Sequence, residues 1–163
     1  MNYTLTVKPE PISLKVLCDD VAALPMRKRV HALEAELLKL PQLEIPPKHY
    51  FSEGAYAREI TIPAGAVVTG KIHKHSQINI LSKGEISVLT ENGIERVKAP
   101  FTVVSPPGTK RVAFAHTECV WTTILGTDEK DPELIEQTFT TNSEAEYLEY
   151  VAQLQLEAPS CHS

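Results

Sequence analysis

The sequence has little cysteine, no long apolar run and no excess of basic residues, and each shortage excludes a class of protein. Its three cysteines, Cys18, Cys119 and Cys161, lie far apart among 163 residues, and this odd number predicts reduced thiols in the cytoplasm instead of a disulfide framework. No segment approaches the roughly 18–20 consecutive apolar residues of a membrane span, and residues 1–14 lack the apolar centre of a signal peptide. The formal net charge of −5 at pH 7 argues against a nucleic-acid partner, because such proteins carry a basic surface.

The length and composition are those of one globular domain. Domains usually run to about 100–150 residues, and at this size a single core buries roughly two thirds of the surface that the unfolded chain exposes. Hydrophobic residues make up 42% of the chain and charged residues 23%, which is ordinary for a globular protein. We therefore expect a core that folds without a metal or a disulfide.

Short β-rich runs separated by glycine and proline turns fill the middle of the chain. Eight runs are predicted as strands: Tyr56–Ile62, Ala66–His73, Gln77–Leu81, Ile86–Thr90, Ile94–Lys98, Phe101–Val104, Arg111–Ala115 and Val120–Leu125. Asn92-Gly93 lies between two alternating runs and predicts a two-residue hairpin, and a second hairpin turn is predicted at His116–Glu118. Many short strands at regular spacing indicate a sandwich or a barrel.

Helical patterns flank the strands on both sides. Before them, four apolar residues recur at helical spacing after the potential cap Asp20: Val30, Leu33, Leu37 and Leu40. After them, Asp131 before Pro132 predicts one helix start, and Ser143 three residues before Glu146 predicts another. The expected organisation is an arm with an edge strand and a helix in residues 1–49, a barrel in 50–126, helices in 127–156 and a disordered tail in 157–163.

Two motifs resemble the signatures of the cupin superfamily. Their residues are Gly70, His73, His75 and Gly84 in the first, and Pro107, Gly108 and Arg111 in the second. The resemblance implies a mostly β fold, namely a cupin-type jelly-roll barrel with one N-terminal helix and short C-terminal helices. The N-terminal part also resembles small cupin-domain proteins of bacteria and phages. In cupins the histidine pair, a Glu or Gln and the histidine of the second signature hold a divalent metal.

One interpretation of the first motif is a metal site. In a regular strand alternate residues face the same side, so Lys71, His73, His75 and Gln77 would all point one way. Two imidazoles at this spacing can bind Mn, Fe, Ni, Cu or Zn, and the resemblance adds Gln77 or Asn79 as a further ligand. The metal hypothesis therefore uses His73, His75 and Gln77 as weak ligands. The alternative for His75 is a solvated position in a turn.

The sequence departs from the cupin signatures at the ligand positions. No acidic ligand is present, and Arg111 stands where the second signature has histidine, although arginine has no lone pair to offer a metal. In a second register the pocket presents Lys71, His73, Gln77 and Arg111, which suit a carboxylate or a phosphate better than a cation. Trp121 is either a core residue or a wall of this pocket. An inward Arg111 needs an anionic partner, because a buried unpaired charge costs several kcal/mol.

Three functions of different classes are compatible with these residues. The favoured one is a small-molecule binding protein that holds an anionic ligand through Lys71, His73, Gln77, Arg111 and Trp121, with no assignable reaction. The second is a metal-dependent cupin enzyme of the isomerase, lyase or dioxygenase type. The third is an oligomeric scaffold, for which the resemblance implies a homodimer. The first two require that the strand bearing His73 faces the strand starting at Arg111 across a closed cup.

Overall fold

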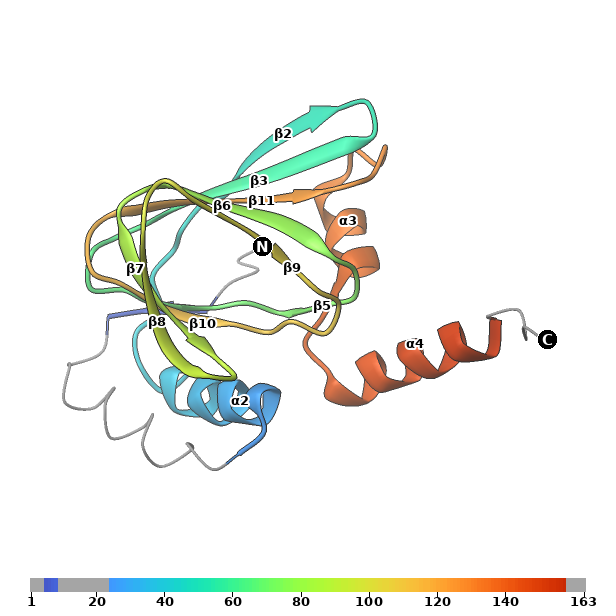
Figure 1. The fold of residues 1–163 in the computed structure, drawn as a ribbon, viewed down its shortest axis with the longest axis horizontal. Coiled ribbons are helices and arrows are strands. Elements are labelled where there is room, and N and C mark those ends of the chain that lie inside the picture. Colours follow the sequence, from blue (N-terminus) through green and yellow to red (C-terminus); the bar gives the residue numbers. More distant parts are fainter. Residues whose placement is uncertain (1–4, 9–23, 158–163) are drawn as a thin grey trace.

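The chain forms two antiparallel β-sheets that face each other, as seen in a computed structural model that describes residues 5–8 and 24–157 (Figure 1). The first sheet contains, in spatial order, β1 (Leu5–Val7), β4 (Val67–Thr69), β10 (Val112–Ala115), β7 (Glu85–Thr90) and β8 (Gly93–Lys98). The second contains β2 (Lys48–Ser52), β3 (Ala55–Ile62), β11 (Cys119–Leu125), β6 (Gln77–Lys83) and β9 (Phe101–Ser105). A short separate pair joins β5 (Ile72–His73) to β12 (Thr140–Thr141).

Most connections cross from one sheet to the other. The pairs β2–β3 and β7–β8 are hairpins within one sheet, whereas β6 to β7 and every step from β8 to β11 change sheet. This winding is that of a jelly roll, so the predicted mostly β fold is confirmed. Among the described strands the two sheets do not pair with each other. The barrel is therefore open, and the expectation of a closed cup is wrong.

Local turn chemistry explains where the predicted strands agree with the structure. Thr90 pairs with Gly93 in the β7–β8 hairpin, and Gly93 has a φ of +113°, a conformation that glycine adopts without strain. The predicted strand Ala66–His73 is divided into β4 and β5 at Gly70. The segment His116–Glu118 joins β10 in one sheet to β11 in the other, so the hairpin predicted there is wrong. None of the predicted strands covers β2, which precedes Tyr56.

The helix α2 (Met26–Leu37) covers the outer face of the first sheet (Figure 1). Its buried residues are Val30, Leu33 and Leu37, three of the four predicted from the helical spacing. They form an apolar cluster with Val67 and Val112 of the sheet. Burial of this face, and not a side-chain cap, holds the helix in place, because Pro25 at its N-terminus makes no capping hydrogen bond.

Two helices follow the strands, as predicted. The Asp131 carboxylate accepts a hydrogen bond of 2.9 Å from the Glu133 amide and caps α3 (Pro132–Phe139), and the Ser143 hydroxyl accepts one of 3.2 Å from the Glu146 amide in α4 (Glu144–Glu157). In Figure 1, α3 lies at one end of the two sheets and α4 extends away from them. No helix among the described residues is long and apolar enough to cross a membrane.

Several expectations fall on residues that the structure does not describe. They concern the potential cap Asp20, the cysteines Cys18 and Cys161, most of the N-terminal arm and residues 158–163. Cys119 is described, and it is a buried free thiol. Glu157, placed in the predicted disordered tail, is the last residue of α4.

Candidate functional site

A cavity of about 80 Å³ lies between the two sheets, and we call it the inter-sheet cavity. All five residues predicted to bind a ligand line it: Lys71, His73, Gln77, Arg111 and Trp121. On this measure one water molecule needs about 10–15 Å³, so the cavity has room for several waters or a small organic molecule.

The strand bearing His73 and the segment before β10 lie side by side. The His73 amide donates a hydrogen bond to the Thr109 carbonyl oxygen at 3.0 Å, and the Gly108 amide donates one to the His73 carbonyl oxygen at 2.7 Å. The Gly70 amide donates a third to the Arg111 carbonyl oxygen at 3.1 Å. The two motifs are therefore neighbours on one wall, and the expectation that they face each other across a cup is wrong. His73 and Arg111 nevertheless line the same cavity, so a receptor that uses both residues does not depend on the closed cup. The opposite wall comes from β3, β6 and β11 of the second sheet, which contribute Arg58, Gln77 and Thr123.

His73 is a neutral imidazole inside the cavity. Burial, followed by the positive charges of Arg58 and Arg111, lowers its pKa to about 3, and the nearby Gln77 side chain opposes this in part. A group with that pKa carries no charge near neutral pH. His73 can therefore donate or accept a hydrogen bond to a ligand, but it adds no positive charge.

Arg111 brings a half-buried guanidinium to the same cavity. Burial lowers its pKa, and the negative charge of Glu95 opposes this in part. Among residues 24–157 no carboxylate lies within ion-pair distance of this guanidinium. Arginine stays protonated in proteins, so the cavity holds a permanent charge whose strongest attraction would be to an anion.

Three further polar atoms at the cavity are buried without a hydrogen-bond partner among the described residues. They are the Thr69 hydroxyl oxygen, the His73 Nδ1 and the Gln77 side-chain oxygen. Buried polar groups nearly always form hydrogen bonds with protein or with ordered water, and a buried group left without a hydrogen bond costs about 1–3 kcal/mol. Three such atoms in one cavity indicate a space that water or a polar ligand fills.

Asn79, the alternative metal ligand, is committed to the protein interior. Its side-chain oxygen accepts hydrogen bonds from Thr123 at 2.9 Å and from the Trp121 indole at 3.3 Å, and its amide nitrogen donates to Ser105 at 2.8 Å. Asn79 therefore positions Trp121 and Thr123 in the cavity wall and has no acceptor to spare for a metal. Trp121 both packs against the core and lines the cavity, so its two predicted roles coexist.

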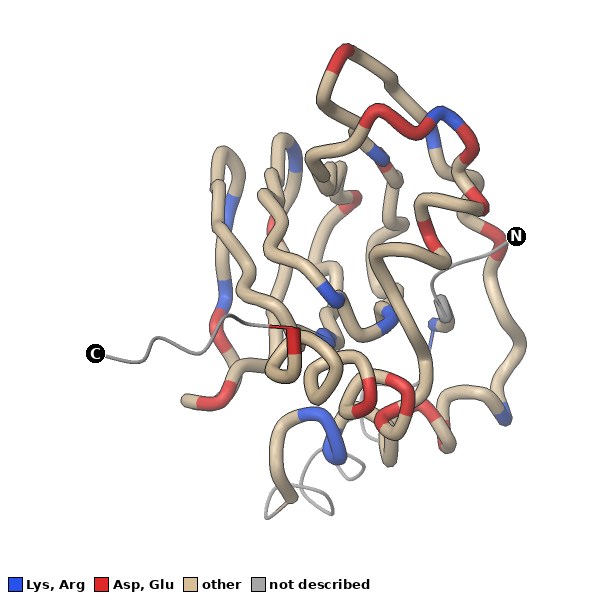
Figure 2. The backbone as a smooth tube through the Cα atoms, turned by 90° about the vertical axis from the view of Figure 1, so that its right-hand side faces the viewer, with Lys and Arg blue, Asp and Glu red and all other residues tan. Residues whose placement is uncertain are grey.

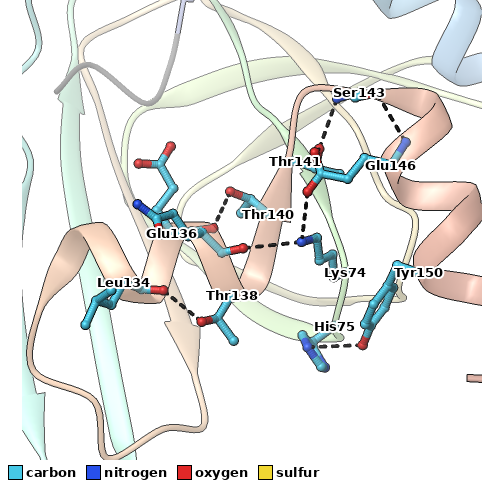
Figure 3. Close-up of polar contacts among 11 residues, drawn as sticks. Lys74, His75, Leu134, Glu136, Thr138, Thr140, Thr141, Ser143, Glu146 and Tyr150 are labelled. Atoms are coloured by element: carbon cyan, nitrogen blue, oxygen red, sulfur yellow. Dashed lines mark hydrogen bonds and ion pairs between the residues drawn. The ribbon is translucent and has the colours of Figure 1, made fainter. Parts of the chain in front are cut away.

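His75 does not reach the inter-sheet cavity. Its ring lies 4.9 Å from that of Phe139 and 5.8 Å from that of Tyr150, whose hydroxyl is 3.3 Å from His75 Nε2 (Figure 3). The strand alternation that was expected to turn it inward stops at His73, where β5 ends. The structure thus does not bring together the predicted metal ligands His73, His75 and Gln77.

The segment after β5 is instead tied to the C-terminal helices. The Lys74 ammonium lies 3.3 Å from both the Gln137 carbonyl oxygen and the Glu146 carboxylate, and the Thr141 hydroxyl donates to Glu146 at 2.6 Å (Figure 3). Thr140 and Thr141 of β12 pair with β5. The first motif therefore serves two purposes: Lys71 and His73 line the cavity, while Lys74 and His75 contact α3 and α4.

Sequence reasoning missed two charged residues at the site. Arg58 of β3 lines the cavity, and Glu136 of α3 forms a close ion pair with Lys71. The period of two in β3 could have suggested Arg58, because it lies on the same face of the strand as the buried residues Tyr56, Ile60 and Ile62. No local signal identifies Glu136, which is brought to Lys71 by the packing of α3.

These residues do not fit the metal site that cupin signatures imply. No group of three His, Cys, Asp or Glu side chains within the described part of the chain could hold a metal ion. The one imidazole in the cavity lies near Arg58 and Arg111, and their positive charges would repel a divalent cation. The cavity therefore has neither enough metal ligands nor the negative charge that a site for a divalent cation needs.

The cations at the cavity are a local feature. In Figure 2, Lys and Arg positions are scattered among Asp and Glu positions over the described residues, without a continuous basic stripe. The protein as a whole carries a formal charge of −5. Arg58 and Arg111 thus place positive charge at a partly buried cavity, where a low dielectric strengthens its attraction for an anion.

Comparison with solved structures finds proteins of similar fold. They include an acetylacetone dioxygenase from Acinetobacter johnsonii (19% identity, TM-score 0.43, 50% of this chain and 59% of that one), a cupin-2 domain containing protein from Shewanella frigidimarina (13%, 0.43, 58% and 92%) and KdgF from Halomonas sp. (22%, 0.44, 51% and 81%). The match spans less than two thirds of the dioxygenase. These neighbours include cupins, the superfamily that the two motifs resemble, and the likeness concerns the fold alone.

No family model matches the chain, and a search of curated proteins finds no match.

Proposed function

We propose that this protein is a receptor for a small organic anion, which it binds in the inter-sheet cavity. One observation carries the proposal, namely the guanidinium of Arg111 at the cavity without a carboxylate partner among the described residues. Burying such a charge unpaired costs several kcal/mol, and an anion in the cavity would offset this cost. A carboxylate also matches the two parallel donors of a guanidinium.

Each predicted binding residue has a distinct role in this proposal. Arg111 holds the anion through two hydrogen bonds, and Lys71, ion-paired with Glu136, forms part of the wall. The neutral His73 and the Gln77 amide offer hydrogen bonds through atoms that no group in the described part of the chain satisfies. Trp121, fixed by Asn79, supplies an apolar wall. We assign no reaction to this set.

A ligand-dependent melting experiment tests the receptor. We expect millimolar acetate, butanoate or phosphate to raise the Tm relative to chloride at equal ionic strength, because a ligand that binds only the native state stabilises it. The substitution Arg111→Gln should abolish the shift, whereas Arg96→Gln, which removes an exposed guanidinium paired with Glu85, should leave it unchanged. Equal melting in all salts, or equal shifts in wild type and Arg111→Gln, would contradict the proposal.

A second candidate function, assembly as a homodimer, is favoured by the outer face of the second sheet. Five apolar residues form a row across its strands, each paired with the next: Tyr50, Ala57, Ile124, Ile78 and Val104. The two ends and Ile78 are exposed by 40% or more. While α2 covers the first sheet, no helix among those described covers this face in Figure 1. Contiguous exposed apolar surface of this kind marks interaction sites.

A second copy of the chain is the partner that this row fits best. The row is centred on the middle strand β11. A two-fold axis near Ile124 would therefore bring the rows of two copies into contact, so that apolar residues face apolar residues as in a symmetric dimer interface. Light scattering coupled to size-exclusion chromatography at micromolar concentration measures the outcome. A monomer under these conditions would remove the assembly candidate without affecting the receptor.

A further inference from the structure

A second cavity, of about 50 Å³, lies beneath α3, and we call it the α3 cavity. It shares five lining residues with the inter-sheet cavity: Arg58, Gly70, Lys71, His73 and Thr123. The two spaces are thus separated by one layer of side chains, among which only those of Lys71 and Arg58 are long and flexible.

The wall that the α3 cavity does not share is mainly apolar. Its seven residues are Tyr56, Leu125, Pro132, Ile135, Glu136, Phe139 and Thr140. Tyr56, Leu125 and Ile135 are buried and form one apolar cluster, against which Phe139 packs. Contact with this cluster stabilises an apolar group by about 0.8 kcal/mol for each buried methylene, or about fourfold in affinity.

Charge distinguishes the two cavities. In the α3 cavity the ammonium of Lys71 and the carboxylate of Glu136 form a close ion pair, with the two side chains only 27% and 11% exposed. Lys71 therefore already has a carboxylate partner there, and Glu136 would repel a second anion. In the inter-sheet cavity Arg111 has no carboxylate partner among the described residues. Arg58 and the neutral His73 belong to the shared wall, so Arg58 adds positive charge beside the anion.

We propose that the two cavities form one site with an anionic end at Arg111 and an apolar end beneath α3, and that its ligand is a monocarboxylate with a short aliphatic tail. This inference rests on the proposed function, because it places the carboxylate at Arg111. The tail passes the side chains of Lys71 and His73 and lies against Leu125 and Ile135. A dicarboxylate of the same length binds less well, because its second carboxylate must lose water beside Glu136 and an apolar wall.

Isothermal titration of the full chain with acetate, butanoate, hexanoate and adipate tests this selectivity. Affinity should rise roughly fifteenfold from acetate to butanoate, since two methylenes are buried, and should not fall from butanoate to hexanoate. Hexanoate should bind at least tenfold more tightly than adipate, which has the same number of carbons. Equal affinities for acetate and hexanoate, or tighter binding of adipate than of hexanoate, would overturn the inference.

The substitution Glu136→Gln tests the origin of the selectivity. It removes the negative charge at nearly constant shape, so adipate should gain at least tenfold in affinity while hexanoate changes by less than threefold. Glu133→Gln is the matched control, because this exposed glutamate lies on the same helix and outside both cavities. Unchanged adipate binding in Glu136→Gln would contradict the assigned role of Glu136. If this variant does not fold, the titrations of the wild-type protein with the four carboxylates still test whether the site has an apolar end.

Failure of the inference and failure of the receptor give different results. If no carboxylate binds the wild-type protein, the receptor itself is wrong. If all carboxylates bind with equal affinity and Arg111→Gln abolishes binding, the receptor stands and the apolar end is wrong.

Discussion

At His73, burial and neighbouring cations act on the imidazole in the same direction. Its pKa of about 3 lies below the ordinary 6.5, so between these pH values the unfolded chain binds a proton that the folded protein does not. The free energy of unfolding therefore falls as the pH drops from 6.5 toward 3, and His73 causes no such loss of stability above pH 6.5. The imidazole is a neutral hydrogen-bonding group throughout the range in which a carboxylate ligand is ionised.

We expect the variant His73→Gln to lose less stability on acidification than the wild type. Between pH 7 and pH 5 the difference should be about 2 kcal/mol, because only the wild type gains a proton on this side chain when it unfolds. Urea denaturation at the two pH values measures it. An equal loss in both proteins, or an NMR titration of His73 with a midpoint near 6.5, would show that the imidazole is not held neutral by burial.

Gly84, the glycine that ends the first motif, is required by space as well as by conformation. Its φ is +91°, and an added Cβ would lie 2.7 Å from Cys119 Sγ and against the Glu118 carbonyl oxygen. Gly84→Ala should therefore destabilise the protein by about 3–4 kcal/mol, through left-handed strain and overpacking together. Gly54→Ala, at φ +69° with nothing within 4 Å, should cost only about 1–2 kcal/mol. Similar losses in thermal unfolding of the two variants would contradict this.

At the scale of elements, a buried ion pair fixes α2 to the sheets. The Lys110 side chain is 0% exposed, and its ammonium donates to Glu34 of α2 at 2.8 Å and to the Gly70 carbonyl oxygen at 2.7 Å. Glu34 is partly exposed, so it can be hydrated if its partner is lost. The pair thus joins the helix to the loop between β4 and β5, which leads into the candidate site.

The two halves of this pair should respond differently to substitution. Glu34→Gln leaves a fully buried ammonium without its counter-charge and should cost about 3–5 kcal/mol, whereas Lys110→Met replaces the charge with an apolar chain of similar length and should cost less. Chemical denaturation of the two variants gives the comparison. If Lys110→Met proved the more destabilising, the hydrogen bonds of the Lys110 ammonium would stabilise the fold by more than the burial of its charge costs.

The segment from Lys71 to Gln77 shows how far strand periodicity predicts a site. Alternation predicted Lys71 and His73 at one cavity, and both line it, with His73 as the last residue of β5. Gln77 lines the same cavity from β6 in the opposite wall, so alternation along one strand does not account for its position. Alternation failed for His75, which lies in the turn between the two strands. The partner that holds this turn is the segment around Phe139 and Tyr150, far away in the sequence, and a local pattern contains no information about it.

For the whole molecule, the jelly roll was predictable because its signals are local, namely runs of period two and glycine or proline turns. The open edges of the barrel, the site of α3 and the ion pair of Lys71 with Glu136 were not, since each depends on contacts between distant segments. Arg111 was the most informative residue in the sequence. A guanidinium where the cupin signature has histidine predicted an anion site, and the structure places Arg111 at the inter-sheet cavity.

The uncovered face of the second sheet gives a prediction about the assembly of the whole molecule. If two copies meet through the apolar row, Ile78→Lys places two ammonium groups in the interface, where burying them costs several kcal/mol. The variant should therefore be monomeric at concentrations where the wild type is a dimer. Ile94→Lys is the matched control, because Ile94 is 65% exposed on β8 of the other sheet and should leave the dimer intact. Light scattering of the three proteins decides, and a dimer that survives Ile78→Lys would place the contact elsewhere.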